Sequence, residues 1–422
     1  MPSPCPIAGA VAVWRERPAG FRTGVRRLPA VRVLAACSLG GAGHLNPLLP
    51  FLAAARRRGD ETLVVAPPGL LALVEESGHA FLAGGEPAEA MVAPIRERLP
   101  VAPRQEASVL GNRELFGRLA TAAMLPAMER ACREWRPDLI LRDPTEYASA
   151  LVGPRRGVPT VQVAISLAEV EAGAIDVATP ALDAHRPGLA AELRAGPYVT
   201  RFPGSLDPSP FAATTRYRAD EAGARPGRAL PDWWGGAGGP LVYVTFGTVL
   251  GHMTMAADIY RIVLRAVGGL TARVLLTVGR RFDPAGLGPV PANVHVEQWV
   301  DQADVLPHAD LVVCHGGSGT VLGALAAGVP TVMLPMFADQ FENARRVIEA
   351  GAGRTVGSGR QGTDEHRRPP GLDDAPAIAG AIDAVLVDPS CRDRARHLAA
   401  EVAAAPAPDA VMAQLLADLP SR

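Results

Sequence analysis

The feature that most constrains the fold is a sequence pattern that occurs twice in the 422-residue chain. The segment DLILRD, which begins at Asp138, leads through a helical pattern to the turn GVPT at Gly157, and DLVVCH at Asp310 leads in the same way to GVPT at Gly328. Short apolar runs that alternate with helical patterns are typical of a parallel α/β sheet, because its strands are buried on both faces. The repetition predicts an α/β protein with two Rossmann-like domains that face each other across a cleft.

The same alternation continues outside the repeated segments. Pro47 suits the start of a helix, because the N–H group that proline lacks is not needed there, and Gly59 suits its end. By contrast, the proline-rich residues 168–228 predict irregular structure. We expect strands at 31–37, 62–66 and from 241 onward, and helices at 47–59 and 68–78.

The domain boundaries are expected to follow the composition. The glycine run at 235–239 is the strongest candidate for a linker. The first 30 residues contain only a short apolar run with no basic residue before it, unlike a secretory signal. We predict a disordered extension at 1–30, a first Rossmann-like domain at 31–230, a linker at 231–239, a second such domain at 240–405, and a C-terminal helix and tail at 406–422.

The composition excludes several classes of function. The net charge is −1, so no overall basic field favours nucleic acid or an anionic membrane. The chain has no lysine, which excludes a phosphate-binding lysine of the Walker type and Schiff-base chemistry. The five cysteines are scattered, which favours neither disulfides nor a zinc site and indicates a cytoplasmic protein. Residues 33–55 are uncharged, but their glycines and prolines predict strand, loop and helix rather than a membrane span.

The segment with the strongest functional signal lies between Cys314 and Gln340. After the apolar run LVVC, the sequence HGGSGT leads into an alanine-rich helical pattern. Glycines allow the backbone to approach an anion, and the free N–H groups at the start of a helix attract negative charge. The turn therefore predicts a diphosphate site, although it also fits an ordinary tight strand–helix turn. The residues concerned are His315, Gly316, Gly317, Ser318, Gly319 and Thr320.

Further polar residues follow other predicted strands, at the edge where open α/β sheets bind ligands. Asp339 and Gln340 suit sugar hydroxyls, but an acid here would also cap a helix. His44 lies just before the predicted helix at Pro47, whose positive end would keep the imidazole neutral at pH 7. Asp143 could hold the other ring nitrogen, so that His44 acts as the base of a His–Asp dyad. Taken singly, the histidine can be an ordinary loop residue and the aspartate a turn or cap residue.

The segment from Trp299 to Gln340 resembles the donor-binding motif of nucleotide-sugar-dependent glycosyltransferases with the GT-B fold. The resemblance is strongest to actinobacterial enzymes that glycosylate antibiotics and other natural products, within the UDP-glycosyltransferase-like family. It extends more weakly from Val31 to about residue 415 and implies that the first domain binds the acceptor and the second the donor. It implies that Trp299 and Val300 hold the nucleobase, that His315 and the turn that ends at Thr320 hold the diphosphate, and that Asp339 and Gln340 hold the sugar. Thr248 would lie near the phosphates or the reacting sugar. His44 with Asp143 would carry out catalysis.

The resemblance implies an inverting hexosyltransferase that needs no metal or other cofactor, and the chain has no DxD motif. Its acceptor would be a hydroxyl group of a small apolar natural product. Relatives commonly have proline where this chain has Asp301. UDP-sugar enzymes usually have a glutamate where this chain has Gly323, and that glutamate is bonded to the ribose hydroxyls. A 2′-deoxyribose lacks one of these hydroxyls, so Gly323 favours a dTDP-sugar donor, with a UDP-sugar as the alternative.

Two other functions are compatible with this scaffold. A nucleotide-sugar epimerase would process the donor without an acceptor. A non-catalytic helper protein should have lost the dyad, so the presence of His44 and Asp143 argues against it. A nicotinamide site is disfavoured, because Asn46 replaces the third glycine of a dinucleotide fingerprint after GGAG. The oligomeric state is left open.

Aromatic residues supply weaker signals. We expect the irregular stretch to shape an acceptor pocket. Trp233 and Trp234 beside the glycine linker either line the cleft or pack between the domains. The candidates for the pocket are Tyr198, Phe202 and Phe211.

Overall fold

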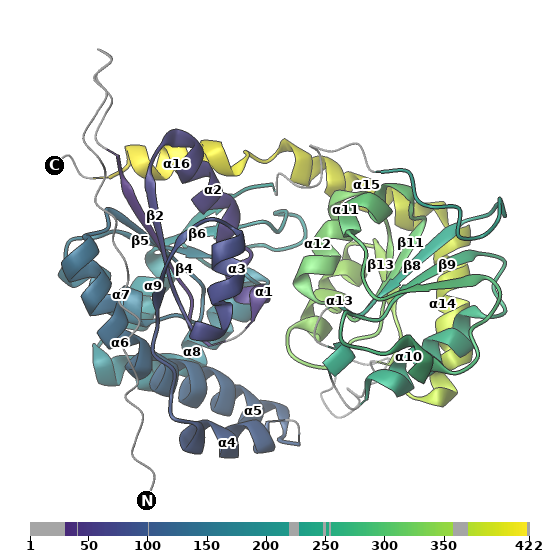
Figure 1. Ribbon diagram of the computed structural model, residues 1–422, viewed down its shortest axis with the longest axis horizontal. Helices are drawn as coiled ribbons and strands as arrows, with labels where there is room; N and C mark the ends of the chain where they lie inside the picture. Colours follow the sequence, from purple (N-terminus) through teal and green to yellow (C-terminus); the bar gives the residue numbers. More distant parts are fainter. Residues whose placement is uncertain are drawn as a thin grey trace, which may run out of the picture.

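The structure is a computed structural model of the chain, and it describes residues 30–39, 41–99, 101–218, 228–247, 250–252, 255–357 and 370–419. The predicted extension at 1–30 therefore lies outside the described residues except for its last position, and Thr248 lies outside them as well. The described residues form two parallel sheets, each with helices around it, and the α/β class predicted from the sequence is confirmed (Figure 1). We call residues 30–218 the first half and residues 228–404 the second half.

The sheet of the first half has the order β3-β2-β1-β4-β5-β6-β7, with every neighbouring pair parallel. Its central strands are apolar and buried, and residues 33–36 of the first strand, for example, are fully buried. The strands are β1 (Arg32–Ala36), β2 (Glu61–Ala66), β3 (Ala80–Ala83), β4 (Leu139–Arg142), β5 (Thr160–Val163), β6 (Pro197–Thr200) and β7 (Ala213–Arg216).

The helices of the first half include two departures from expectation. Residues 168–228 were predicted to be irregular, which is wrong: α8 is 18 residues long and accommodates Pro180, and β6 and β7 follow it. The helix expected to open near Pro47 begins two residues later, at Leu49, and His44 lies in a separate short helix before it. The helices are α1 (Ala42–Leu45), α2 (Leu49–Arg58), α3 (Leu71–Glu76), α4 (Glu89–Arg98), α5 (Arg104–Ser108), the π-helical η2 (Val109–Ala120), α6 (Thr121–Arg130), the π-helical η3 (Ala131–Trp135), α7 (Ala148–Arg155), α8 (Ala168–His185) and α9 (Leu189–Ala195).

The sheet of the second half has the order β10-β9-β8-β11-β12-β13 and is also parallel. Its strands are β8 (Leu241–Thr245), β9 (Arg273–Thr277), β10 (Val294–Glu297), β11 (Leu311–Cys314), β12 (Thr331–Met333) and β13 (Gly353–Thr355). Its helices are α10 (Ala256–Val267), α11 (Gln302–Val305), α12 (Ser318–Ala326), α13 (Gln340–Glu349), α14 (Ala375–Val387) and α15 (Pro389–Ala404).

The repeated sequence pattern is reproduced by hydrogen bonds at equivalent places in the two halves. The carboxylate of Asp138 accepts from the backbone N–H of Arg32 at 2.8 Å, and that of Asp310 accepts from the N–H of Leu241 at 2.9 Å. Each aspartate thereby fixes the start of the repeated strand against the start of the first strand in its half. The prediction of two halves on one plan is therefore confirmed.

The last helix, α16 (Pro408–Ala417), returns to the first half and packs on α2 (Figure 1). Its residues Val411 and Met412 are buried in the core under β1. Just before α16 the chain meets the end of the first half, where Arg218 donates from its backbone N–H to the carbonyl of Pro406 at 3.0 Å and from Nη1 to that of Ala405 at 2.7 Å. Among the described helices, none has the length and apolar character needed to cross a membrane.

Candidate active site

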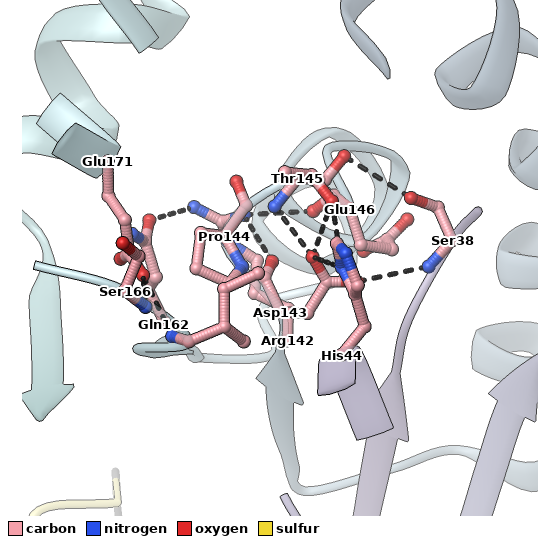
Figure 2. Close-up of polar contacts among 11 residues, drawn as sticks. Ser38, His44, Arg142, Asp143, Pro144, Thr145, Glu146, Gln162, Ser166 and Glu171 are labelled. Carbon is pink, nitrogen blue, oxygen red and sulfur yellow. Dashed lines mark hydrogen bonds and ion pairs between the residues drawn. The ribbon is translucent and has the colours of Figure 1, made fainter. Parts of the chain in front are cut away.

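The two predicted dyad residues lie next to each other. His44 comes from α1, which follows β1, and Asp143 follows β4, the neighbour of β1 in the sheet. The Nδ1 atom of His44 lies 3.3 Å from Oδ1 of Asp143, which is fully buried, whereas one fifth of the His44 side chain is exposed. The Nδ1 atom of the ring thus faces a buried carboxylate, and part of the side chain remains accessible to solvent (Figure 2).

The Asp143 carboxylate has additional partners that the sequence did not identify. Its Oδ1 accepts from the backbone N–H of Thr145 at 2.7 Å and from the Thr145 hydroxyl at 2.6 Å, and its Oδ2 accepts from the N–H of Ser38 at 3.1 Å. Asp143 therefore stabilises its own turn as well as facing His44. A threonine two residues after an aspartate at a strand end is the local signal that could have revealed this turn.

The electrostatics of the pair favour a charged histidine. Burial by itself lowers the pKa of His44, but the carboxylate of Asp143, with smaller contributions from Glu171 and Asp339, raises it above 6.5 overall. Burial alone would raise the pKa of Asp143, but His44 and the hydrogen bonds from Thr145 lower it overall. The expectation that a helix start would keep His44 neutral is wrong, because His44 lies in the last turn of a four-residue helix.

The glycine-rich turn of the second half occupies the equivalent strand end. His315 follows β11, and Gly317 precedes the first residue of α12. Gly316 has φ = 86°, and a Cβ atom at Gly317 would lie 2.4 Å from Nε2 of His315, so both positions require glycine. The imidazole is consequently packed directly over the start of an α-helix.

His315 differs from His44 in having an unused polar atom. Its Nδ1 is buried and has no hydrogen-bond partner among the described residues. Burial lowers the pKa of His315 to about 4, although Asp339 acts in the opposite direction. The ring is therefore neutral at pH 7 and can donate one N–H.

Asp339 connects the glycine-rich turn with the first half. Its Oδ2 accepts from the hydroxyl of Ser318 at 2.8 Å, from Nδ2 of Asn343 at 3.2 Å, and across the two halves from the hydroxyl of Ser166 at 2.8 Å. The side chain makes no capping bond to α13, so the helix-cap interpretation is not supported. Gln340 is buried, and its Oε1 accepts from the backbone N–H groups of residues 336 and 337.

The predicted nucleobase residues lie apart from this network. Trp299 is 48% exposed, and the guanidinium of Arg280 lies 4.2 Å above its ring. Val300 packs against the core of the second half. A Cβ atom at Gly323 would lie 3.2 Å from Cδ1 of Leu306 and 3.5 Å from Oε1 of Gln302.

The aromatic residues expected to shape an acceptor pocket are core residues instead. Tyr198 and Phe211 stack on each other with centroids 4.0 Å apart, and Phe202 packs in the core cluster that also contains strands of the second half. All three are at most 4% exposed, so the expectation is wrong for this structure. A ring that the sequence analysis missed is Phe116 of η2, which is partly buried and stacks on His44 at 6.0 Å.

Comparisons with known proteins were made for the whole chain. Residues 53–182 and 261–418 match the N-terminal and C-terminal domains of the erythromycin biosynthesis protein CIII-like family. The elloramycin glycosyltransferase ElmGT of Streptomyces olivaceus is 34% identical over 91% of this chain and 97% of its own length, and the L-demethylnoviosyl transferase of Streptomyces niveus is 32% identical over 90% and 96%. The chain belongs to this family of natural-product glycosyltransferases.

The fold of this glycosyltransferase agrees with that assignment. The spinosyn rhamnosyltransferase SpnG superposes with a TM-score of 0.72 at 26% identity, over 92% of this chain and all of SpnG. SpnG has also been solved with thymidine diphosphate and with the spinosyn aglycone. The predictions of a GT-B fold and of glycosyltransferase activity are confirmed.

The candidate site of this glycosyltransferase thus lies at the carboxyl ends of two parallel sheets. The first half supplies a histidine held by a buried carboxylate, and the second supplies a neutral imidazole over a helix start. In the described parts of the chain, no three His, Cys, Asp or Glu side chains are grouped as metal ligands would be. Besides the contact of Ser166 with Asp339, the halves are joined by ion pairs of Arg104 with Glu342 and of Arg345 with Glu169.

Proposed function

We propose that this enzyme transfers a sugar from a dTDP-sugar to a hydroxyl group of a small apolar natural product, with inversion at the anomeric carbon. The observation that carries the proposal is the His44–Asp143 pair at 3.3 Å, in which one fifth of the His44 side chain remains exposed. A hydroxyl group is a poor nucleophile while protonated, and a positioned imidazole is the usual group that removes its proton.

In the proposed reaction, the proton of the acceptor hydroxyl goes to Nε2 of His44 and the new imidazolium is stabilised by Asp143. The acceptor oxygen forms a bond to the anomeric carbon while the bond from that carbon to the diphosphate oxygen breaks. The departing nucleoside diphosphate receives hydrogen bonds from His315 and from the free N–H groups at the start of α12. These groups meet the charge of the leaving group without a metal ion, which is why we propose metal-independent transfer.

The roles of the two halves follow from this reaction. The first half binds the acceptor. Phe116, which lies beside His44, offers the acceptor an apolar surface. The second half binds the donor, with the nucleobase at Trp299 and Val300, the diphosphate along the turn from His315 to Thr320, and the sugar at Asp339 and Gln340. The oxygen of Asp339 that accepts from Ser166 and Ser318 shows that this carboxylate is already oriented to accept from hydroxyl groups. Thr248 is proposed for the phosphates from its sequence position alone.

The choice of dTDP rests on Gly323. Its α-carbon faces Gln302 and Leu306 on α11 and the turn that follows, so no side chain reaches from this position toward a ribose. The complex of SpnG with thymidine diphosphate and its complex with an aglycone contain ligands of the two classes that we propose here. Because the four described cysteines are all free and buried, we also propose a reducing, cytoplasmic location.

The test is an acceptor screen with dTDP-glucose and UDP-glucose as donors and a panel of apolar phenols and macrolactones, in the presence of EDTA. We expect release of the nucleoside diphosphate only when an acceptor is present. Consumption of donor without acceptor would show an epimerase or hydrolase instead. A preference for UDP-glucose would contradict the role of Gly323, and activity that requires added Mg²⁺ would contradict the metal-independent mechanism.

A further inference from the structure

A buried group of polar side chains beside the dyad has no part in the reaction described so far. Arg142, the residue before Asp143, is 1% exposed, and a buried guanidinium is costly unless each of its donors is used. Gln162 and Glu171 are buried next to it. Together the three residues connect the end of β4, the strand β5 and the start of α8 (Figure 2).

The guanidinium surrounds the turn that carries Asp143. Nη1 of Arg142 lies within hydrogen-bond distance of three backbone carbonyl oxygens of this turn, those of Asp143 at 3.0 Å, Pro144 at 3.2 Å and Glu146 at 2.9 Å. These carbonyl groups belong to Asp143 itself and to two residues that follow it in the turn. A shift of the guanidinium would therefore shift the carboxylate as well.

The guanidinium is itself held in place by a second pair of contacts. Nη2 of Arg142 donates to Oε1 of Gln162 at 2.5 Å, and Nε2 of Gln162 donates to Oε2 of Glu171 at 3.0 Å. Arg142 and Gln162 are register partners on neighbouring parallel strands, so their side chains share one face of the sheet. An amide both accepts and donates, which allows glutamine to join a guanidinium to a carboxylate.

Glu171 anchors the far end of this chain of contacts. Its Oε1 accepts from the backbone N–H groups of Ile165 and Ser166, both at 2.8 Å, just before α8 begins. None of the buried nitrogen and oxygen atoms of these three side chains lacks a hydrogen-bond partner, so the group forms a rigid support rather than a loose set of polar residues.

We propose that Arg142, Gln162 and Glu171 form a positioning network that holds Asp143 against His44. The contact that the network would control is sensitive, because 3.3 Å is near the upper limit for a hydrogen bond and a small displacement of the turn would break it. The three residues act through Asp143 and do not touch the substrates. The inference rests on the proposed function only for the role of the dyad in the reaction.

The experiment measures the dyad without any substrate. The protein is labelled with ¹³C-histidine, and the Cε1–H resonance of His44, identified by its loss in His44→Ala, is followed against pH. Electrostatic interactions with Asp143, Glu171 and Asp339 raise the pKa of His44, and burial raises the pKa of Glu171 itself to about 8. In Arg142→Lys the positive charge remains but the fork that reaches the three carbonyls and Gln162 is lost. We expect the midpoint of the His44 titration to move to lower pH, by less than Asp143→Asn moves it.

A double-mutant comparison decides whether the effect passes through Asp143. In an Asp143→Asn background, Arg142→Lys should cause no further shift. A shift of the same size in both backgrounds, or none in either, would overturn the proposal. Gln162→Met, which removes both bridging bonds, provides a second variant if the first does not fold, with the same expected results.

The matched control is Asn293→Leu in the second half. The amide of Asn293 also donates to three backbone carbonyl oxygens, those of residues 267, 270 and 272, but it lies far from the dyad in the fold. This variant should lower the melting temperature and leave the His44 titration unchanged. The titration uses neither the sugar donor nor the acceptor substrate, so failure of this test leaves the proposed transfer reaction intact. That reaction is tested separately by the activity of His44→Ala.

Discussion

The two halves place opposite kinds of side chain at the same position of the same fold. The strand β4 ends next to Asp143, whose carboxylate accepts hydrogen bonds from Ser38 and Thr145 and remains charged. The strand β11 ends next to His315, which burial keeps neutral and whose Nδ1 has no partner among the described residues. The first strand end is saturated by the protein, whereas the second keeps a donor for a ligand. The comparison supports the proposal that one half holds the catalytic base and the other binds an anion.

The largest expected effect comes from removing the histidine of the first half. General-base assistance is typically worth about 10²–10⁴-fold in rate, or roughly 3–5 kcal/mol of barrier. In His44→Ala we therefore expect kcat to fall by this factor while the affinity for dTDP, measured by calorimetry, stays near that of the wild type. Full turnover in this variant would show that His44 is structural and would remove the functional difference between the halves.

Removing the histidine of the second half, His315, should weaken the binding of dTDP, which His44→Ala leaves nearly unchanged. A hydrogen bond to a charged group contributes roughly 1.5–3 kcal/mol, so His315→Ala should weaken dTDP binding by about tenfold to a hundredfold. The change can be read from a titration of dTDP or from the smaller stabilisation of the protein by the ligand in thermal melts. Unchanged binding would contradict the assignment of the diphosphate to this turn.

The third prediction concerns pH. His44 must be neutral to accept a proton, and its pKa lies above 6.5 because of Asp143, so kcat/KM should fall as the pH decreases through that raised pKa. Asp143→Asn removes the negative charge, lowers the pKa of His44 and moves this acid limb to lower pH. We also expect a decrease in kcat of about tenfold, equivalent to about 1.4 kcal/mol. An acid limb that does not move would exclude Asp143 as the partner of the base.

The last prediction concerns stability rather than activity and tests the shared plan of the halves. Gly157 and Gly328 end equivalent helices with φ values of 69° and 68°. An alanine in this left-handed conformation costs about 1–2 kcal/mol. Gly328→Ala should be the more destabilising, since its Cβ would lie 3.2 Å from Cγ of Arg396, whereas Gly157 has open space. Urea unfolding measures both, and a loss of stability at only one position would show that the two turns are not equivalent.

Much of the fold could be predicted because buried parallel strands have continuous apolar sequences. The strand β8 begins at Leu241 as expected, β1 is one residue shorter than predicted at each end, and β2 begins one residue earlier than predicted. The helix α8 was missed because Pro180 and the glycine at 173 suggest a break, whereas burial of one face of this helix outweighs these local preferences. Local sequence patterns do not report such tertiary contributions.

The site was predictable to the extent that its residues follow strands. His44 and Asp143 were named from that rule, and the structure brings them together. The support of Asp143 by Arg142 and Gln162 depends on the register of β4 and β5, which no local pattern specifies. The contact of Ser166 with Asp339 depends on how the two halves meet. Such contacts between distant segments are visible only once the chain is folded.

The meeting of Arg218 with Pro406 has a consequence for motion. The chain passes between the halves twice, once after β7 and once before α16, and the two passages touch at this point. The halves also meet through Ser166 with Asp339, Arg104 with Glu342 and Arg345 with Glu169, so this crossing is one of several fastenings. Any motion that separates the His44 ring from the His315 turn must break those contacts, whereas the two joined passages can stay together and act as the point about which the halves turn.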